Sequence, residues 1–557
     1  MRKNFNSGTL RKWRLFLSLT GLFTLVLTAC GDSTSTAVPP TSTVAASTTA
    51  AATTAQTTAT STKASTTAAA TTAASTNGAD PLLFPVNNFT EQTVTVTTST
   101  GTKEVTYRLY QHITYVAKPV DANYQSMDVK VPVKVDGKAV DATNAPILFG
   151  NSVGGYMSSS NTSSGTNPGG MGGTGMNGAP PMGSKGGAPG GNSSGVSRNT
   201  DLALAAGYVV VAPGARGRDN QAADGTYYGK APAAIVDLKS AIRYIRHNKG
   251  IIPGNTDWIV STGVSAGGAL SALLGASGNS HLYDSYFKEI GAADEDDTIF
   301  ASADFCPIMD LENADMAYEW MFGTIPLNGK LVDQTLSQQL KNAFATYQTS
   351  LNLKGANNFG TITADNYGNY LVQTYLIPSA NKYLSALTDE KRATYLATNS
   401  WITWSNNSAT FTFDDYVKHV GRMKSLTAFD ALDLTQAENI LFGNKTTNAR
   451  HFTNFSLQQS SGNTTAEVAS DLKTVVNLMN PMYFISQNSS GVAKYWWIRY
   501  GSSDNNTALS VIINLATSLE NKGKDVNTLL YWDAGHGADE DPEAFIAWIG
   551  KITGFTK

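Results

Sequence analysis

The chain has few of the residues that build metal centres, disulfide frameworks or basic surfaces. Its 557 residues include only two cysteines and six histidines, and charged residues make up 15% of the total. The formal net charge of −3 argues against a nucleic-acid-binding protein, which normally carries a clustered basic excess. With so few nitrogen and sulfur ligands, we expect no metal and no cofactor.

The N-terminal residues are typical of an exported, lipid-anchored protein. Residues 1–29 combine five basic side chains with a short apolar run at 15–27, too short to span a membrane comfortably. The run ends in Leu27-Thr28-Ala29-Cys30, which resembles the lipobox of bacterial lipoproteins, in which the cysteine is lipidated. We therefore expect a membrane anchor at Cys30 and an extracytoplasmic location. A plain signal peptide or an uncleaved anchor is the alternative.

Two low-complexity segments are expected to be disordered. Residues 30–79 are almost entirely Ser, Thr and Ala, and residues 158–197 are rich in Gly, Ser, Asn and Met. Neither composition can bury enough apolar surface to offset the entropy of ordering. We expect a flexible stalk and a surface loop. Beyond the stalk, Cys306 has no cysteine partner and is expected to be a buried small residue.

The remaining chain alternates short apolar runs with helical patterns. Residues 92–118 alternate apolar and polar side chains like antiparallel strands, and buried strands are expected at 146–149, 208–211 and 258–260. A helix should occupy 232–250, and strand signals return at 301–306, 495–500 and 528–531. This order predicts an α/β fold, a mostly parallel sheet with helices on both faces, formed by residues 80–320 and 480–557. Residues 321–479 should form an inserted, mainly helical cap domain.

Three Gly-x-Ser-x-Gly strings occur, centred on Ser152, Ser193 and Ser265. A nucleophile elbow requires a buried strand before the serine and a helix directly after it. Only Ser265 meets both conditions, because Ser152 leads into a Gly/Ser/Asn stretch and Ser193 lies in the Gly-rich segment. The pattern favours Ser265 as the nucleophile of an α/β-hydrolase fold. A tight strand-to-helix turn without chemistry is the alternative.

A serine nucleophile needs a base and an orienting acid, which follow it in this fold in the order acid, then histidine. His536 follows the last predicted strand and precedes a closing helix, so it is the expected base. Asp504 follows the penultimate strand and is the expected acid, although it could merely cap the next helix. Asp533 is the second candidate for the acid.

Backbone amides are expected to stabilise the oxyanion of a tetrahedral intermediate. One should be the N–H of Ala266, directly after the nucleophile. The other should come from the loop after the first parallel strand, where Gly154 and Gly155 let the backbone approach closely.

Residues 294–297 are acidic and could hold calcium, but a solvated charged loop is the preferred interpretation.

Several longer strings resemble bacterial tannases of subtype B, which are α/β-hydrolases that cleave galloyl esters. They include Gly214-Ala215-Arg216-Gly217-Arg218, the elbow extended to Ser280, Asp315-Met316-Ala317-Tyr318-Glu319-Trp320, Gly421-Arg422-Met423-Lys424 and His451-Phe452-Thr453. The resemblance implies that Lys424 and Glu438 hold the hydroxyls of the acyl group. A third position has a carboxylate in that family and is Asn506 here. A hydroxycinnamoyl ester therefore competes with a galloyl ester as substrate.

These patterns predict a serine carboxylesterase that acts on a small phenolic ester through an acyl-enzyme. A feruloyl esterase or a serine peptidase of the same fold remains an alternative. A solute-binding lipoprotein is the non-enzymatic alternative. It would not explain why a serine, an aspartate and a histidine follow one another along the chain in the order that an α/β-hydrolase requires. The sequence gives no indication of the oligomeric state.

Overall fold

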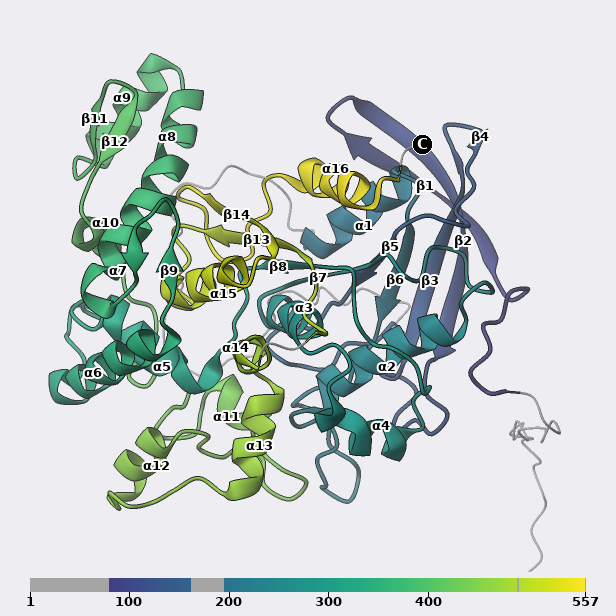
Figure 1. The fold of residues 1–557 in the computed structure, drawn as a ribbon, viewed down its shortest axis with the longest axis horizontal. Coiled ribbons are helices and arrows are strands. Elements are labelled where there is room, and N and C mark those ends of the chain that lie inside the picture. Colours follow the sequence, from purple (N-terminus) through teal and green to yellow (C-terminus); the bar gives the residue numbers. More distant parts are fainter. Residues whose placement is uncertain (1–79, 162–194, 488–489, 556–557) are drawn as a thin grey trace, which may run out of the picture. The chain divides into compact units, whose positions relative to one another are not determined.

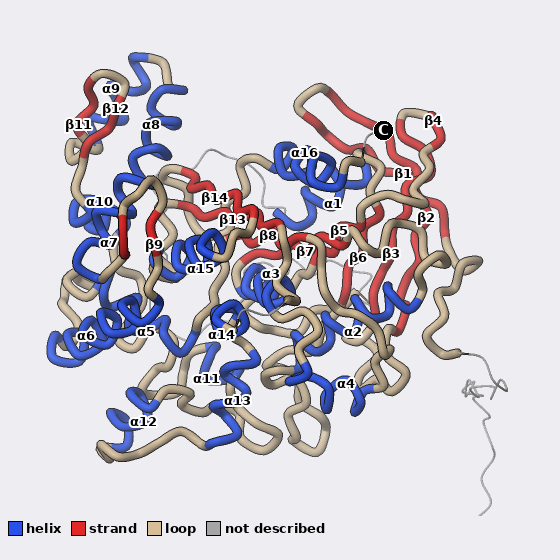
Figure 2. Tube along the Cα trace, in the orientation of Figure 1, coloured by secondary structure: helices blue, strands red, loops and turns tan. Residues whose placement is uncertain are grey.

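A ten-stranded mixed sheet is the central element of the chain (Figures 1 and 2). The computed structural model describes residues 80–161, 195–487 and 490–555, all within one unit, Asn77–Lys557. The strand order is β1-β2-β3-β6-β5-β7-β8-β13-β14, with β4 paired to β3. Their bounds are β1 Thr90–Thr98, β2 Gly101–Thr114, β3 Ser126–Val135, β4 Lys138–Ala139, β5 Ile147–Gly150, β6 Val209–Pro213, β7 Ile259–Val264, β8 Ala301–Phe305, β13 Tyr495–Gly501 and β14 Asp525–Tyr531.

The sheet changes character along its width. Strands β1, β2 and β3 form an antiparallel meander that joins β6, as the alternating pattern of residues 92–118 predicts. From β6 through β5, β7, β8 and β13 to β14 every pairing is parallel. Parallel strands end at the same edge, so the loops after β5, β7, β8, β13 and β14 come together there.

Alternate residues of the parallel strands enter two separate apolar cores. Phe149 and Trp496 lie in the core on one face, while their neighbours Leu148 and Trp497 lie in the other. The first core includes residues of helices α2 (Ala233–His247), α3 (Ala266–Ala276) and α15 (Leu509–Asn521), and the second includes those of α1 (Gly195–Ala205) and α16 (Pro542–Thr553). The predicted mostly parallel sheet with helices on both faces is confirmed (Figure 1).

A mainly helical segment is inserted between the neighbouring strands β8 and β13 (Figure 2). Its helices are α5 Leu311–Phe322, α6 Gln334–Leu351, α7 Ala364–Leu371, α8 Ile377–Ala386, α9 Asp389–Thr398, α10 Phe413–Val420, α11 Ala437–Leu441, α12 Asn454–Ser461, α13 Ser470–Leu478 and α14 Pro481–Ser486. It also contains two small hairpins, β9 Lys354–Gly355 with β10 Gly360–Thr361 and β11 Thr403–Ser405 with β12 Ser408–Thr410. The expected cap boundary at residue 321 falls inside α5, because that helix continues without a break from the loop after β8.

The two ends of the inserted segment are joined by buried polar contacts. Asn480, where the segment returns, donates from Nδ2 to Asp310 at 2.8 Å and to Glu312 at 2.7 Å, where the segment begins. Tyr347 of α6 donates its hydroxyl to the same Asp310 carboxylate at 2.5 Å. The beginning and the end of the inserted segment therefore lie next to each other.

Several predicted features lie outside the described residues: the signal peptide, Cys30, the stalk and most of the Gly-rich segment. The last residues of that segment, 195–197, differ from the expected loop because they form the first turn of α1. Among the described helices, none combines the length and the apolar character needed to cross a bilayer.

Candidate active site

The expected nucleophile lies at a sharp turn between a buried strand and a helix. Ser265 follows β7, precedes α3 and has φ 61° and ψ −121°, a backbone conformation that is rare for a residue with a side chain. Its N–H donates to the carbonyl of Phe305 at 2.9 Å. A Cβ atom at Gly263 would lie 2.4 Å from the carbonyl oxygen of Gly267, so the turn requires glycine there. This is the geometry that the sequence predicts for a nucleophile elbow.

The expected base and acid are hydrogen-bonded to each other. His536 Nδ1 and Asp504 Oδ2 are 2.7 Å apart, and the Asp504 side chain is fully buried while the imidazole is 21% exposed. The other oxygen, Asp504 Oδ1, accepts from the N–H and the side-chain amide of Asn506 at 2.9 and 3.2 Å. The carboxylate therefore favours a proton on Nδ1, which leaves Nε2 as the basic nitrogen.

Asp533, the second candidate acid, has different partners. It accepts hydrogen bonds from His419 Nε2 at 2.7 Å, the Ser503 hydroxyl at 2.8 Å and the Tyr395 hydroxyl at 3.0 Å. Burial raises the pKa of Asp533, but hydrogen bonds from His419 and Ser503 outweigh it and hold that pKa below its ordinary value. Asp533 thus connects the inserted segment to the loops that carry Asp504 and His536.

The elbow and the histidine loop meet at the end of β8. The N–H of Gly537 donates to the Cys306 sulfur at 3.3 Å, and a Cβ at Gly537 would lie 3.5 Å from Val264 Cγ1, next to Ser265. The Ser265 hydroxyl itself makes no hydrogen bond with any described residue. The hydrogen bond between a catalytic serine and its histidine is often long in the absence of substrate and shortens in the reacting complex.

The loop after β5 lies against the elbow helix. The Asn151 side-chain amide donates to the carbonyls of Thr262 and Gly267 at 3.2 and 3.1 Å and to the Ser271 hydroxyl at 3.1 Å. The backbone N–H groups of residues 152–156, which include Gly154 and Gly155, donate to no described residue. The same holds for the N–H of Ala266. This part of the site therefore offers amide donors to a ligand.

The residues implied by the resemblance form one electrostatic group. Lys424 interacts with Glu438, Asp315 and Asp504, and its ammonium lies 3.7 Å from the centroid of the Phe429 ring. Burial lowers the pKa of Lys424, and the three carboxylates partly counteract this. Neither the Lys424 ammonium nor the Glu438 carboxylate has a hydrogen-bond or ion-pair partner among the described residues. Both charges are thus available to a ligand.

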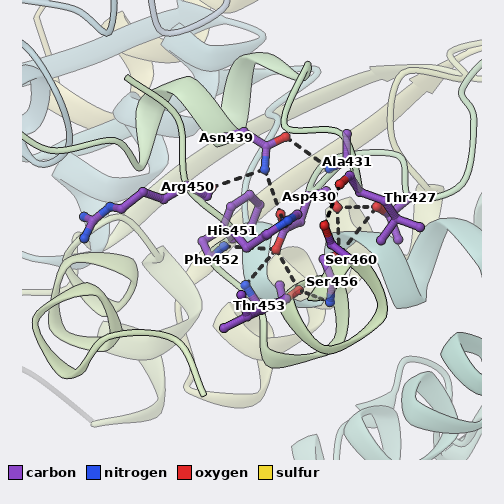
Figure 3. A network of polar contacts seen from close by, with 12 residues as sticks. Thr427, Asp430, Ala431, Asn439, Arg450, His451, Phe452, Thr453, Ser456 and Ser460 are labelled. Carbon is purple, nitrogen blue, oxygen red and sulfur yellow. Dashed lines mark hydrogen bonds and ion pairs between the residues drawn. The ribbon is translucent and has the colours of Figure 1, made fainter. Parts of the chain in front are cut away.

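The buried Asp430 carboxylate accepts hydrogen bonds from several segments of the chain, and Figure 3 shows this network. Asp430 Oδ1 accepts from His451 Nδ1 at 2.8 Å and Asn439 Nδ2 at 2.7 Å. Its Oδ2 accepts from the N–H groups of Phe452 and Thr453 and from the Thr453 hydroxyl, at 3.0, 2.8 and 2.7 Å. Since Asn439 follows Glu438 directly, this network fixes the helix that carries Glu438.

Asp315 of α5 completes this arrangement from the other side. Its two carboxylate oxygens accept the N–H groups of Phe429 and Asp430 at 2.8 and 3.0 Å. Burial raises the pKa of Asp315 to about 7, although the backbone N–H groups of Asp430 and Phe429 lower it. We did not anticipate Asp315 and Asp430 as site residues. In the sequence, Asp315 stands out only because it belongs to one of the strings that resemble tannases, and the resemblance implies no role for it.

Two groups of side chains contain atoms of the kind that bind metal ions. Ligand atoms of Cys306, Asp504 and His536 lie within 4.8 Å of one another. Burial, and then Asp504, raises the pKa of Cys306 to about 12, which disfavours the thiolate that a metal would bind. In the acidic stretch 294–297, Asp297 is already paired with Lys239 at 2.7 Å and Arg243 at 2.9 Å.

Comparison with known proteins places the chain in a family. Residues 187–352 match the family model described as BD-FAE. Esterase LipQ of Mycobacterium tuberculosis is 37% identical over 90 residues, which are 16% of this chain and 20% of that protein. The solved tannase of Fusobacterium nucleatum is similar at 35% identity with a TM-score of 0.70, over 85% of this chain and 99% of that one. A tannin acyl hydrolase solved in complex with ethyl gallate is also 35% identical, with a TM-score of 0.71 over 85% and 99%. The chain is therefore an ester hydrolase with the α/β-hydrolase fold, and it belongs to the tannase family.

Proposed function

We propose that the protein is a serine carboxylesterase that hydrolyses small phenolic-acid esters, with Ser265 as nucleophile, His536 as base and Asp504 as orienting acid. The observation that carries the proposal is the 2.7 Å hydrogen bond between His536 Nδ1 and buried Asp504, in a chain whose Ser265 lies at a strained elbow. This combination of nucleophile, base and orienting acid is the arrangement that acyl transfer requires.

The reaction proceeds in two half-reactions. His536 Nε2 accepts the Ser265 hydroxyl proton as Oγ attacks the ester carbonyl carbon, and the carbonyl oxygen becomes an oxyanion. The N–H of Ala266 and an N–H from the Gly154–Gly155 loop donate to that oxyanion. The protonated imidazole then gives its proton to the leaving alkoxide, which departs as an alcohol. Water, deprotonated by His536, attacks the acyl-enzyme, and the acid leaves while Ser265 regains its proton.

The acyl group is held beside the triad by the charges of the inserted segment. Lys424 and Glu438 supply a cation and a carboxylate that have no hydrogen-bond or ion-pair partner among the described residues, and both suit phenolic hydroxyls. The ethyl gallate complex of the similar tannin acyl hydrolase supports a galloyl ester as substrate. No cofactor is needed for this chemistry.

Asn506 favours a broader choice of acyl groups, including feruloyl esters. A carboxylate can only accept a hydrogen bond, which suits a free phenol. An amide can accept from a phenol through its oxygen or donate a second N–H to a methoxy oxygen. Because Asn506 also donates to Asp504, it lies next to the acid that orients the base.

Hydrolysis of methyl gallate and methyl ferulate by the protein and its Ser265→Ala variant tests the proposal. We expect turnover of methyl gallate that the substitution abolishes. If only methyl ferulate is hydrolysed, the assignment of the triad would stand, and the proposed substrate would change from a galloyl to a feruloyl ester. Absence of Ser265-dependent hydrolysis of either ester would contradict the phenolic-esterase assignment and favour the peptidase or solute-binding alternatives.

The export of the protein as a lipoprotein anchored at Cys30 is the second part of the proposal. Its support is the basic start, the short apolar run and the small residues before Cys30. Radiolabelled palmitate supplied to expressing cells should enter the protein but not its Cys30→Ser variant. Equal labelling of both would exclude Cys30 as the anchor.

A further inference from the structure

Arg218 contacts the loop that carries the expected oxyanion donors. Its backbone N–H donates to the carbonyl of Tyr156 at 2.9 Å, and its side-chain Nε donates to the carbonyl of Gly155 at 2.7 Å. One residue therefore holds two consecutive carbonyls of the loop after β5.

Those two loop residues adopt a conformation that requires support. Gly155 and Tyr156 both have left-handed φ values, 54° and 57°. For tyrosine this conformation is unfavourable, because it brings Cβ too close to the following carbonyl oxygen. Tyr156 is buried, and its hydroxyl donates to the carbonyl of Ile308 at 2.7 Å. The loop is thus constrained from both ends of this residue.

The segment containing Arg218 follows the oxyanion loop closely. Asp219 accepts from the N–H and the hydroxyl of Ser158 at 2.6 and 2.8 Å. A Cβ at Gly217 would lie 2.0 Å from the backbone nitrogen of Ser158, so only glycine permits the contact. The segment is itself held by Lys230, which donates to the Arg218 carbonyl at 2.8 Å.

The guanidinium of Arg218 also connects this loop to the acyl-binding charges. It interacts electrostatically with Glu438 and with the adjacent Asp219, while its terminal nitrogens hydrogen-bond to no described residue. Arg218 therefore makes its side-chain hydrogen bond to the loop after β5 and also interacts with Glu438, which is proposed to bind the acyl group.

We propose that Arg218 is a positioning residue for ester hydrolysis: it fixes the Gly155–Tyr156 backbone so that the free amides of this loop meet the oxyanion. The inference rests on the proposed serine-esterase function. A misplacement of about 1 Å at a reacting group can lower a rate roughly 100-fold. The loss of Arg218 should therefore reduce the rate of the chemical step more than the binding of substrate.

Arg218→Lys and Arg218→Ala, with the exposed Arg108→Ala as matched control, test this inference. p-Nitrophenyl acetate is the substrate, because its acyl group needs no phenolic pocket. Benzeneboronic acid is the probe for the oxyanion site, because its tetrahedral adduct with a serine mimics the intermediate. The Lys variant retains a cation and guards against failure of the Ala variant to fold, and added guanidinium chloride tests rescue of Arg218→Ala.

We expect kcat to fall at least about tenfold in both Arg218 variants, with KM within about twofold and boronate affinity reduced in parallel with kcat. Millimolar guanidinium should restore part of the lost rate in Arg218→Ala. Unchanged kcat and boronate affinity would overturn the inference, as would a change confined to KM. If the unaltered protein hydrolyses p-nitrophenyl acetate but not phenolic esters, the proposed substrate fails while the inference on Arg218 is still decided. Absence of any Ser265-dependent hydrolysis would overturn both.

Discussion

Replacing Asp430 by Asn should weaken substrate binding and leave the chemistry of the proposed triad nearly unchanged. The carboxylate accepts five hydrogen bonds, two at Oδ1 and three at Oδ2. If the new amide keeps its oxygen toward Phe452 and Thr453, its NH2 group faces the donors of Asn439 and His451. The bond from Asn439 is then lost, because its own Oδ1 is held by the N–H of Ala431 at 3.1 Å.

The size of the effect follows from these contacts. Hydrogen bonds to charged groups contribute about 1.5–3 kcal/mol each, and two such bonds at Oδ1 are removed. His451 can change tautomer and accept from the new amide, which recovers part of the loss. We expect the free energy of unfolding to fall by about 3 kcal/mol, and the melting temperature to fall by several degrees.

Kinetics on two substrates and a neighbouring variant make this prediction specific. Asp430→Asn should raise KM for methyl gallate about tenfold or more. A displaced Lys424 or Glu438 needs to weaken binding by only about 1.4 kcal/mol to lower the affinity tenfold. Hydrolysis of p-nitrophenyl acetate should change little. Asp433→Asn is the control, because exposed Asp433 only holds Thr435 in the same loop. Equal melting temperatures for the two variants, or an equal loss on both substrates, would refute the reasoning.

Three further predictions concern the proposed triad, the ends of the inserted segment and the buried Cys306 thiol. Asp504→Asn should lower kcat roughly 10⁴-fold by favouring the wrong tautomer, whereas Asp533→Asn should lower it much less; the reverse order would identify Asp533 as the acid. Burial and neighbouring Asp310 raise the pKa of Glu312 to about 8 from 4.5, so its stabilising contribution is present below pH 4.5 and is lost as the pH rises through about 8. Glu312→Gln should flatten this decline in melting temperature, and an unchanged slope would contradict it. The Cys306 thiol, whose pKa burial raises to about 12, should resist iodoacetamide at pH 8 until the protein is unfolded, and rapid labelling of the folded protein would argue against its burial.

The parts of the site that follow from local pattern could be predicted from the sequence. The sharp turn at Ser265 could be predicted because a buried strand, small residues and a helix surround it within a short segment. Asp504 and His536 each follow an apolar strand near the C-terminus, so their order and placement were visible. The structure favours Asp504 over Asp533 only through the partners that each carboxylate has in space.

The parts that depend on contacts between distant segments could not be predicted. Arg218 and Gly155 are 63 positions apart in sequence, and nothing around Arg218 indicates a partner. Asp315 and Asp430 are separated by 115 positions, and each looks like an ordinary surface acid in its own segment. Their burial arises from the packing of the inserted segment, which has no simple periodicity to reveal it.

The insertion between β8 and β13 has a consequence for how the enzyme is made. In the order in which the chain emerges to fold, β8 is complete at Phe305, but its neighbour β13 begins only at Tyr495. Until then β8 presents an unpaired edge, a feature that promotes association between incomplete chains. The proposed nucleophile emerges early, whereas the proposed acid and base belong to the loops after the last two strands. A chain interrupted within the insertion would hold Ser265 without Asp504 or His536, so ester hydrolysis should require nearly the whole chain.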